Sequence, residues 1–125
     1  TYYRQILNAI PDLILVKNRQ NQPTWANATF RAFAGIAPGE ALDALPDWSK
    51  PENLRLDQHV IETGQPVTLE TPHIRADGEV RQFQTIKNPL VNETGAVSQL
   101  LEVSRDITDL SEARETLLRK DRLLS

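Results

Sequence analysis

The chain contains no cysteine and no methionine in its 125 residues. Without cysteine it cannot form disulfides, thiolate metal sites, a thiolate nucleophile or a cysteinyl-flavin photosensor. The absence is compatible with a reducing compartment, and we expect a cytoplasmic protein. Because the sequence starts at Thr1 and has no methionine, we expect one domain of a longer polypeptide.

Long apolar runs and blocks of like charge are also missing. The longest apolar run, residues 13–16, is far shorter than the roughly 20 residues of a membrane-spanning helix, so we expect no membrane insertion. The 14 basic and 17 acidic residues give a net charge of −3, and neither sign forms a patch suited to a nucleic-acid backbone.

Motifs of catalysis are absent as well. The sequence has no G-x-S-x-G, Walker A, G-x-G-x-x-G or H-E-x-x-H pattern, and His59 and His73 are its only histidines. Two histidines alone are too few for a structural zinc site. We therefore expect a regulatory domain with no metal and no activity of its own.

The first half of the chain has mostly helical periodicity. Tyr3, Ile6, Leu7 and Ile10 share one face of a short helix that Pro11 ends. Two short strands are predicted at 13–17 and 24–26. A helix capped by Asn27 should follow and end at Gly35, then an irregular stretch at 36–51 and a helix from Glu52 to Thr63 and Gly64.

The second half of the chain changes to the periodicity of extended strands. Strands are predicted at residues 67–75, 80–90 and 96–106, joined by turns that carry Gly78 and Gly95. An exit helix should begin near Asp109, with Glu112 three residues later as in a capping box.

Several local motifs occur in a recognisable order. They are residues 9–12 (AIPD), 25–30 (WANATF) and 62–64 (ETG), and, most specifically, 77–78 (DG), 87–90 (KNPL) and 104–108 (SRDIT). The last is similar to the D-I-T signature with which many PAS domains pass into a helical linker. The chain resembles the PAS sensor family over roughly residues 6–110.

This resemblance implies an α+β fold with a five-stranded antiparallel sheet of order 2-1-5-4-3. Helices should cover one face and enclose a small pocket. The expected parts are a flanking helix at residues 1–10, the PAS domain at 11–108 and the start of a signalling linker helix at 109–125.

The resemblance also implies a role. PAS domains of this kind occur in bacterial multidomain sensor histidine kinases, cyanobacterial ones included, so we expect a signal-input domain beside a GAF, PAS or kinase module. Two alternatives remain: a ligand-free dimerisation and spacing module, and the input domain of a cyclic-dinucleotide enzyme.

The pocket residues follow from the family register, because alternate strand residues point to the same face. The candidates for the pocket are His73, Phe83, Thr85, Leu100, Glu102, Ser104, Phe30 and Phe33. Ionisable side chains on apolar strands suggest a polar wall for a small organic ligand. Alternatively, Glu102 and His73 lie at the rim, or pair with each other or with Lys87.

No cofactor is expected. Haem-binding members take their histidine about eleven residues before the glycine that matches Gly64, and Asn53 stands there. His59 lies about one and a half turns further along the helix, so it should not point to the same place.

The opposite set of strand residues should form an apolar outer face at Ile86, Leu101 and Val103; a one-residue slip would exchange the two sets. The helix stripe of Tyr3, Ile6, Leu7 and Ile10 is the expected cover, within one chain or across a homodimer.

Asp106, Ile107 and Thr108 form the expected signalling junction. Asp106 can accept backbone hydrogen bonds or pair with an arginine such as Arg105 or Arg114, and Thr108 or Asp109 can cap the exit helix. The junction is either a helix cap alone, or a helix cap that also acts as a signalling switch when its hydrogen bonds change.

Overall fold

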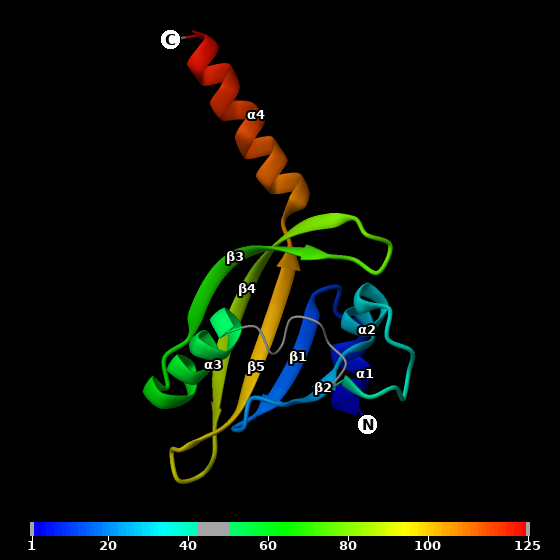
Figure 1. Ribbon diagram of the computed structural model, residues 1–125, viewed down its shortest axis with the longest axis vertical. Coiled ribbons are helices and arrows are strands. Elements are labelled where there is room, and N and C mark those ends of the chain that lie inside the picture. Colours follow the sequence, from blue (N-terminus) through cyan, green and yellow to red (C-terminus); the bar gives the residue numbers. More distant parts are fainter. Residues whose placement is uncertain (1, 43–50, 125) are drawn as a thin grey trace.

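The computed structural model describes residues 2–42 and 51–124. Its elements are α1 (Tyr2–Ala9), β1 (Leu13–Asn18), β2 (Pro23–Ala26), α2 (Ala28–Ala34), α3 (Pro51–Thr63), β3 (Val67–Ile74), β4 (Val80–Val91), β5 (Val97–Asp106) and α4 (Thr108–Leu124) (Figure 1). Each predicted helix and strand is present, with small differences at its ends. Of the predicted irregular stretch, residues 36–42 form no α-helix or strand, and residues 43–50 lie outside the described residues.

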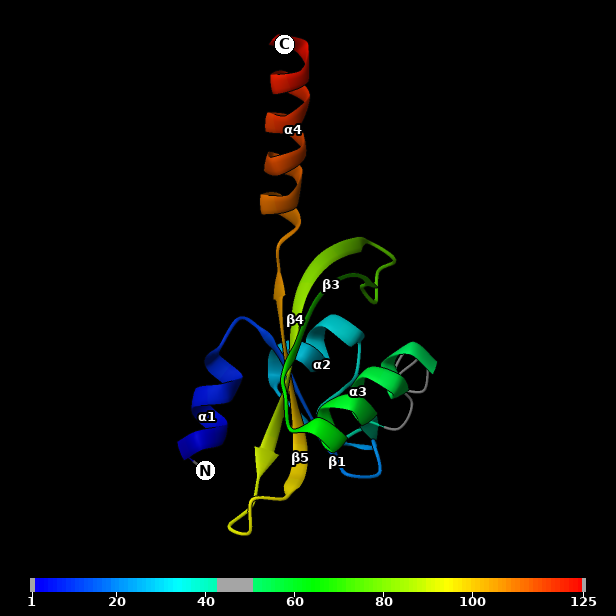
Figure 2. The ribbon, with the colours of Figure 1, turned by 90° about the vertical axis from the view of Figure 1, so that its left-hand side faces the viewer.

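The five strands form one antiparallel sheet in the order β2-β1-β5-β4-β3, which confirms the predicted fold class. Figure 2 shows α2 and α3 on one side of the sheet and α1 on the other. Helix α4 leaves the end of β5 and extends away from the sheet. The interior of the domain therefore lies between the sheet and the pair α2 and α3.

The second half forms the predicted three-strand meander. Val67 to Ile74 of β3 pair with Lys87 to Val80 of β4, and β4 pairs in turn with β5. The turns contain Gly78 and Gly95 with φ of 89° and 85°, where a side chain would strain the backbone. The glycine positions thus fix both hairpins.

The buried side chain of Asn27 connects α1, β1 and α2 in the first half of the chain. It has no exposed surface, and its Oδ1 accepts hydrogen bonds from the backbone N–H of Ile14 at 3.1 Å and of Phe30 at 2.9 Å. Its Nδ2 donates to the carbonyls of Leu7 at 2.9 Å and Asp12 at 3.0 Å. The predicted helix cap is confirmed, and the same side chain also holds α1 and β1.

The outer face of the sheet carries the expected apolar residues. Ile86 pairs with Val103, and these two side chains and Leu101 are half-buried. Tyr3 and Ile6 of α1 remain 76% and 43% exposed, so within one chain they do not cover this face as expected.

The position of α1 explains that difference. Its last turn is tied to the domain, because the Leu7 carbonyl accepts from Asn27 and the Asn8 side chain accepts from the N–H of Ala28 at 2.9 Å. Leu7 and Ile10, which lie at this end, are half-buried, while Tyr3 near the start is exposed. The bonds of Leu7 and Asn8 therefore attach the last turn of the helix to the domain.

Replacing Asn27 by alanine should lower the free energy of unfolding by about 3 kcal/mol or more, because four buried or part-buried backbone groups lose their partner. Urea unfolding measures the change. Asn8→Ala is the matched control: it removes one bond at an exposed site and should cost less than about 1 kcal/mol. Equal losses in the two variants would contradict this account of Asn27.

Candidate functional site

A cavity of about 390 Å³ lies between the inner face of the sheet and the helices α2 and α3. Six of the eight predicted pocket residues line it: His73, Thr85, Glu102, Ser104, Phe30 and Phe33. Phe83 and Leu100 point to the same face but are buried in the core, at 2% and 0% exposure. Phe83 supports the wall, since its ring contacts the rings of Phe33 and His73 edge to face at 5.1 and 5.3 Å between centroids.

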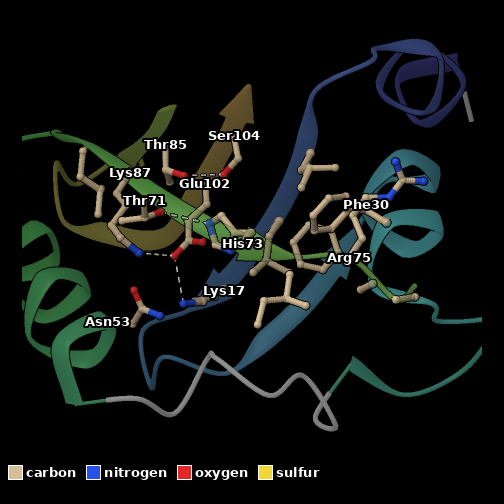
Figure 3. A pocket seen from close by; sticks show the side chains of 17 residues that line it. Lys17, Phe30, Asn53, Thr71, His73, Arg75, Thr85, Lys87, Glu102 and Ser104 are labelled. Carbon is tan, nitrogen blue, oxygen red and sulfur yellow. Dashed lines mark hydrogen bonds and ion pairs between the residues drawn. The ribbon is translucent and has the colours of Figure 1, made fainter. Parts of the chain in front are cut away.

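At one end of the cavity lies a ring of four charged residues, of which three are buried and Glu102 is half-buried. Lys17 of β1 contacts Asp57 of α3 at 2.6 Å and Glu102 of β5 at 2.9 Å, measured from Nζ to the carboxylate oxygen. Lys87 of β4 contacts the same two carboxylates at 2.7 and 2.6 Å. We call these four residues the charge ring; Figure 3 shows its lysines and Glu102 at the cavity wall.

Two further polar contacts lie along the cavity wall. The hydroxyl groups of Thr85 and Ser104 are hydrogen-bonded at 2.7 Å. The imidazole Nε2 of His73 lies 3.2 Å from the Thr71 hydroxyl. His73 and Glu102 therefore do not pair with each other; Glu102 pairs with Lys87, one of the alternatives expected from the sequence, and also with Lys17.

A second polar cluster stands where β5 passes into α4. Asp106 Oδ2 accepts from Arg81 Nε at 2.8 Å, and Oδ1 accepts from the backbone N–H and the hydroxyl of Thr108 at 2.9 and 2.6 Å. The Thr108 hydroxyl in turn accepts from the N–H of Gln82 at 2.9 Å, and the N–H of Ile107 donates to the Gln82 carbonyl at 2.8 Å. The exit helix is thus bonded to β4.

Asp106 accepts a backbone hydrogen bond and pairs with an arginine, as expected, but that arginine is Arg81 and neither of the two named from the sequence. Arg105 points to Asp12 at 3.7 Å and Arg114 to Glu70 at 3.5 Å. Neighbours along a strand point to opposite faces, which separates Arg105 from Asp106. Phe83 is the register partner of Asp106, and Arg81 two residues before it reaches the carboxylate along the adjacent strand.

A family model for the PAS fold matches residues 7–112 of the chain. The chain belongs to the PAS family. Among solved structures, a PAS domain of a protein from Colwellia psychrerythraea superimposes with a TM-score of 0.69 at 17% identity, covering 86% of this chain and 96% of that one. This likeness supports the fold.

Two curated relatives are signalling enzymes. A diguanylate cyclase of Vibrio cholerae serotype O1 is 34% identical over 119 residues, which cover 90% of this chain and 37% of that protein. The methanogenesis regulatory histidine kinase FilI of Methanothrix harundinacea is 30% identical over 128 residues, 98% of this chain and 14% of that protein. This PAS chain spans only a minor part of each relative, and it is a regulatory input domain of signalling proteins rather than a catalytic one.

Asn53 is the residue that the spacing from Gly64 aligns with the histidine expected in haem-binding members. Asn53, in the first turns of α3, lines the cavity near Lys17 (Figure 3), while His59 on the same helix is exposed. Within residues 2–42 and 51–124, no group of three or more histidine, aspartate or glutamate side chains could hold a metal ion. Over the same residues, no helix has the length and apolar character to cross a membrane.

Two members of the charge ring were not predicted from the sequence. Lys17 follows Leu13 and Leu15 at the inward positions of β1, so strand alternation alone places its side chain inside. Asp57 lies three and four residues before Val60 and Ile61, the buried face of α3. The local sequence pattern therefore indicates that both side chains are buried, but it does not reveal their ion-pair partners.

The ring controls the ionisation of its members. Burial favours the neutral form of Glu102, but the ammonium groups of Lys17 and Lys87 outweigh it and hold the pKa of Glu102 below its usual range. Burial likewise disfavours the charged form of Lys87, yet Glu102 and Asp57 together raise its pKa. At the junction, burial is outweighed by Arg81 and Thr108, which lower the pKa of Asp106.

Glu102→Gln should reduce the dependence of stability on acid pH. Because the pKa of Glu102 is lower in the folded than in the unfolded chain, its contribution is complete above the ordinary carboxyl pKa of about 4.3 and is lost as pH falls through the folded-state pKa. Thermal unfolding between about pH 6 and pH 3 should therefore show a shallower decline for the variant than for the wild type. Glu93→Gln, in an exposed turn, should keep the wild-type slope, and identical slopes in all three proteins would refute the role of Glu102.

Arg81→Gln should loosen the junction without disturbing the cavity. Without the Arg81 contact, Asp106 holds the first turn of α4 less firmly, and the amides of Ile107 and Thr108 should exchange with deuterium faster. Arg75→Gln is the control, because the ion pairs of Arg75 with described residues are to Asp77 and Glu79 in the neighbouring hairpin, at 3.7 and 3.6 Å. Unchanged protection at Ile107 and Thr108 would show that Arg81 does not hold the helix.

Proposed function

We propose that this PAS domain is a cytoplasmic sensory input module that binds a small organic molecule in its cavity. The bound state is relayed through β5 and the Asp106 junction to α4, and from there to an output module of the same polypeptide. The cavity with its polar end is the single observation that carries this proposal.

The cavity favours a sensor over a ligand-free spacer. Close-packed interiors contain few voids larger than a water molecule, whereas ligand pockets typically measure about 300–1,000 Å³ and combine apolar walls with a few polar groups. The cavity of about 390 Å³ matches that description, with Leu13, Leu15 and Leu69 on its apolar side and Thr85 and Ser104 among its polar groups. A spacer domain needs no such space.

The relay has a direct structural route. Glu102 of the charge ring, Ser104 and Asp106 lie on the same strand, and each side chain is bonded to a residue of β4. A ligand that moves Glu102 therefore acts on the strand that ends at α4. The exposed Leu110 and Leu117 of α4 can then pair with a second copy in a homodimer, together with the outer face at Ile86, Leu101 and Val103.

For the output module we propose a histidine kinase, reached directly or through an adjacent GAF or PAS module. The relative of 30% identity named as a histidine kinase supports this choice. A diguanylate cyclase is the second candidate, since the relative of 34% identity carries that name. In either case the chemistry belongs to the output module.

A native mass spectrum of the domain purified from its expression host tests ligand binding. We expect a reproducible additional mass in the wild type, and its loss in Ala34→Phe, where the new ring fills the cavity from α2. Ala32→Phe is the matched control on the same helix, because Ala32 is exposed. Bare protein in all three samples, with no binding in a fragment screen, would favour the spacer function instead.

A further inference from the structure

The charge ring is electrically neutral as a whole. Two ammonium groups and two carboxylates alternate around it, so their formal charges cancel. Asp57 is fully buried behind the wall, while Lys17, Lys87 and Glu102 line the cavity. A ligand that brought a net charge to this end would find no counter-charge left, and an unpaired buried charge is costly.

Among the described residues of the wall, Arg75 and His73 are the other ionisable side chains, and each has a partner of its own. Arg75 is already paired with Asp77 and Glu79, and in Figure 3 it lies across the cavity from Lys17. His73 is hydrogen-bonded to Thr71. The polar end at the ring is therefore the part of the wall that selects the charge of a ligand.

The ring nevertheless retains hydrogen-bonding capacity. An ammonium group has three N–H donors. Lys87 donates to Asp57 and Glu102, and Lys17 donates to Asp57 and forms an ion pair with Glu102, so neither lysine uses all three donors on the ring. Both lysines contact Oε1 of Glu102, which leaves Oε2 of that carboxylate to accept. Donors and an acceptor thus stand side by side at one end of the cavity.

The opposite end of the cavity carries aromatic and aliphatic side chains beside Arg75. Phe30 lies across the cavity from the lysines in Figure 3, and Phe33 and Ala34 of α2 complete that side. A flat apolar group packs well against such aromatic rings.

We propose that the cavity selects an uncharged ligand whose polar head offers both a carbonyl acceptor and an N–H or O–H donor, as a carboxamide does, and whose body is apolar or aromatic. The carbonyl accepts from Lys17 or Lys87, and the donor reaches Oε2 of Glu102. This inference rests on the proposed ligand-sensing function and adds the chemical class of the ligand.

Three probes of nearly equal shape test the inference: 3-phenylpropanamide, 3-phenylpropanoate and 3-phenylpropylamine. Calorimetric titration of the whole chain is run at pH 8 for all three probes, where the carboxylate and the amine are both charged. The amide should bind about tenfold or more tightly than the carboxylate and the amine. Equal or tighter binding of either charged probe overturns the inference and leaves ligand sensing itself intact.

A charge variant provides the second arm. Glu102→Gln leaves the ring with one excess positive charge, so the ratio of amide to carboxylate affinity should fall by about tenfold. Thr85→Val, which changes the wall without changing its charge, should keep the wild-type ratio. An unchanged ratio in folded Glu102→Gln overturns the inference; if that variant does not fold, the wild-type comparison alone decides.

If no probe binds, the native mass spectrum decides. An uncharged bound molecule with an N–H or O–H group supports the inference. A charged bound molecule overturns the inference but leaves the proposed ligand-sensing function intact. Absence of any bound molecule overturns the inference together with the proposed function.

Discussion

Two lysines and two carboxylates meet out of water where α3 lies against the sheet. Asp57 is the helix's contribution, and each of its oxygens holds a lysine from a different strand, while Glu102 bridges the same lysines from β5. Removing one member of a buried ion pair leaves an uncompensated charge, at a cost of about 3–5 kcal/mol. The four groups are therefore interdependent, and together they fix the position of α3.

The position of α3 determines the cavity. Asn53, on the same helix as Asp57, forms part of its wall, and the lysines and Glu102 form its polar end. The charge ring thus has two roles that follow from one arrangement: it attaches the helix to the sheet, and it sets the electrostatic character of the space beneath the helix. A change at the ring would alter both.

Strands β4 and β5 connect that space to the exit helix. The pairs Lys87–Glu102 and Thr85–Ser104 are direct neighbours in the register, and Arg81–Asp106 follows at the end of the sheet. Each pair joins the two strands by side chains in addition to the backbone ladder. Asp106 then engages Thr108 in the first turn of α4, so the polar row runs from the cavity to the helix that leaves the domain.

Local patterns predicted much of this architecture. The resemblance to the PAS family gave the correct inner and outer faces of strands 80–90 and 96–106, because with a side-chain period of two one aligned position fixes the facing of the whole strand. Asn27, Gly35 and Gly64 marked helix ends correctly, since caps depend on a few neighbouring residues. The D-I-T motif located the start of the exit helix for the same reason.

The sequence by itself determined the helices, the strands, the facing of their side chains and the PAS topology. Only the tertiary structure decided which charges meet. Asp57 is 40 residues from Lys17 and 30 from Lys87 along the chain, and Asp106 pairs with Arg81, 25 residues away, rather than with the adjacent Arg105. Periodicity tells that a side chain points inward, but the partner of a buried charge depends on which strands and helices become neighbours in space.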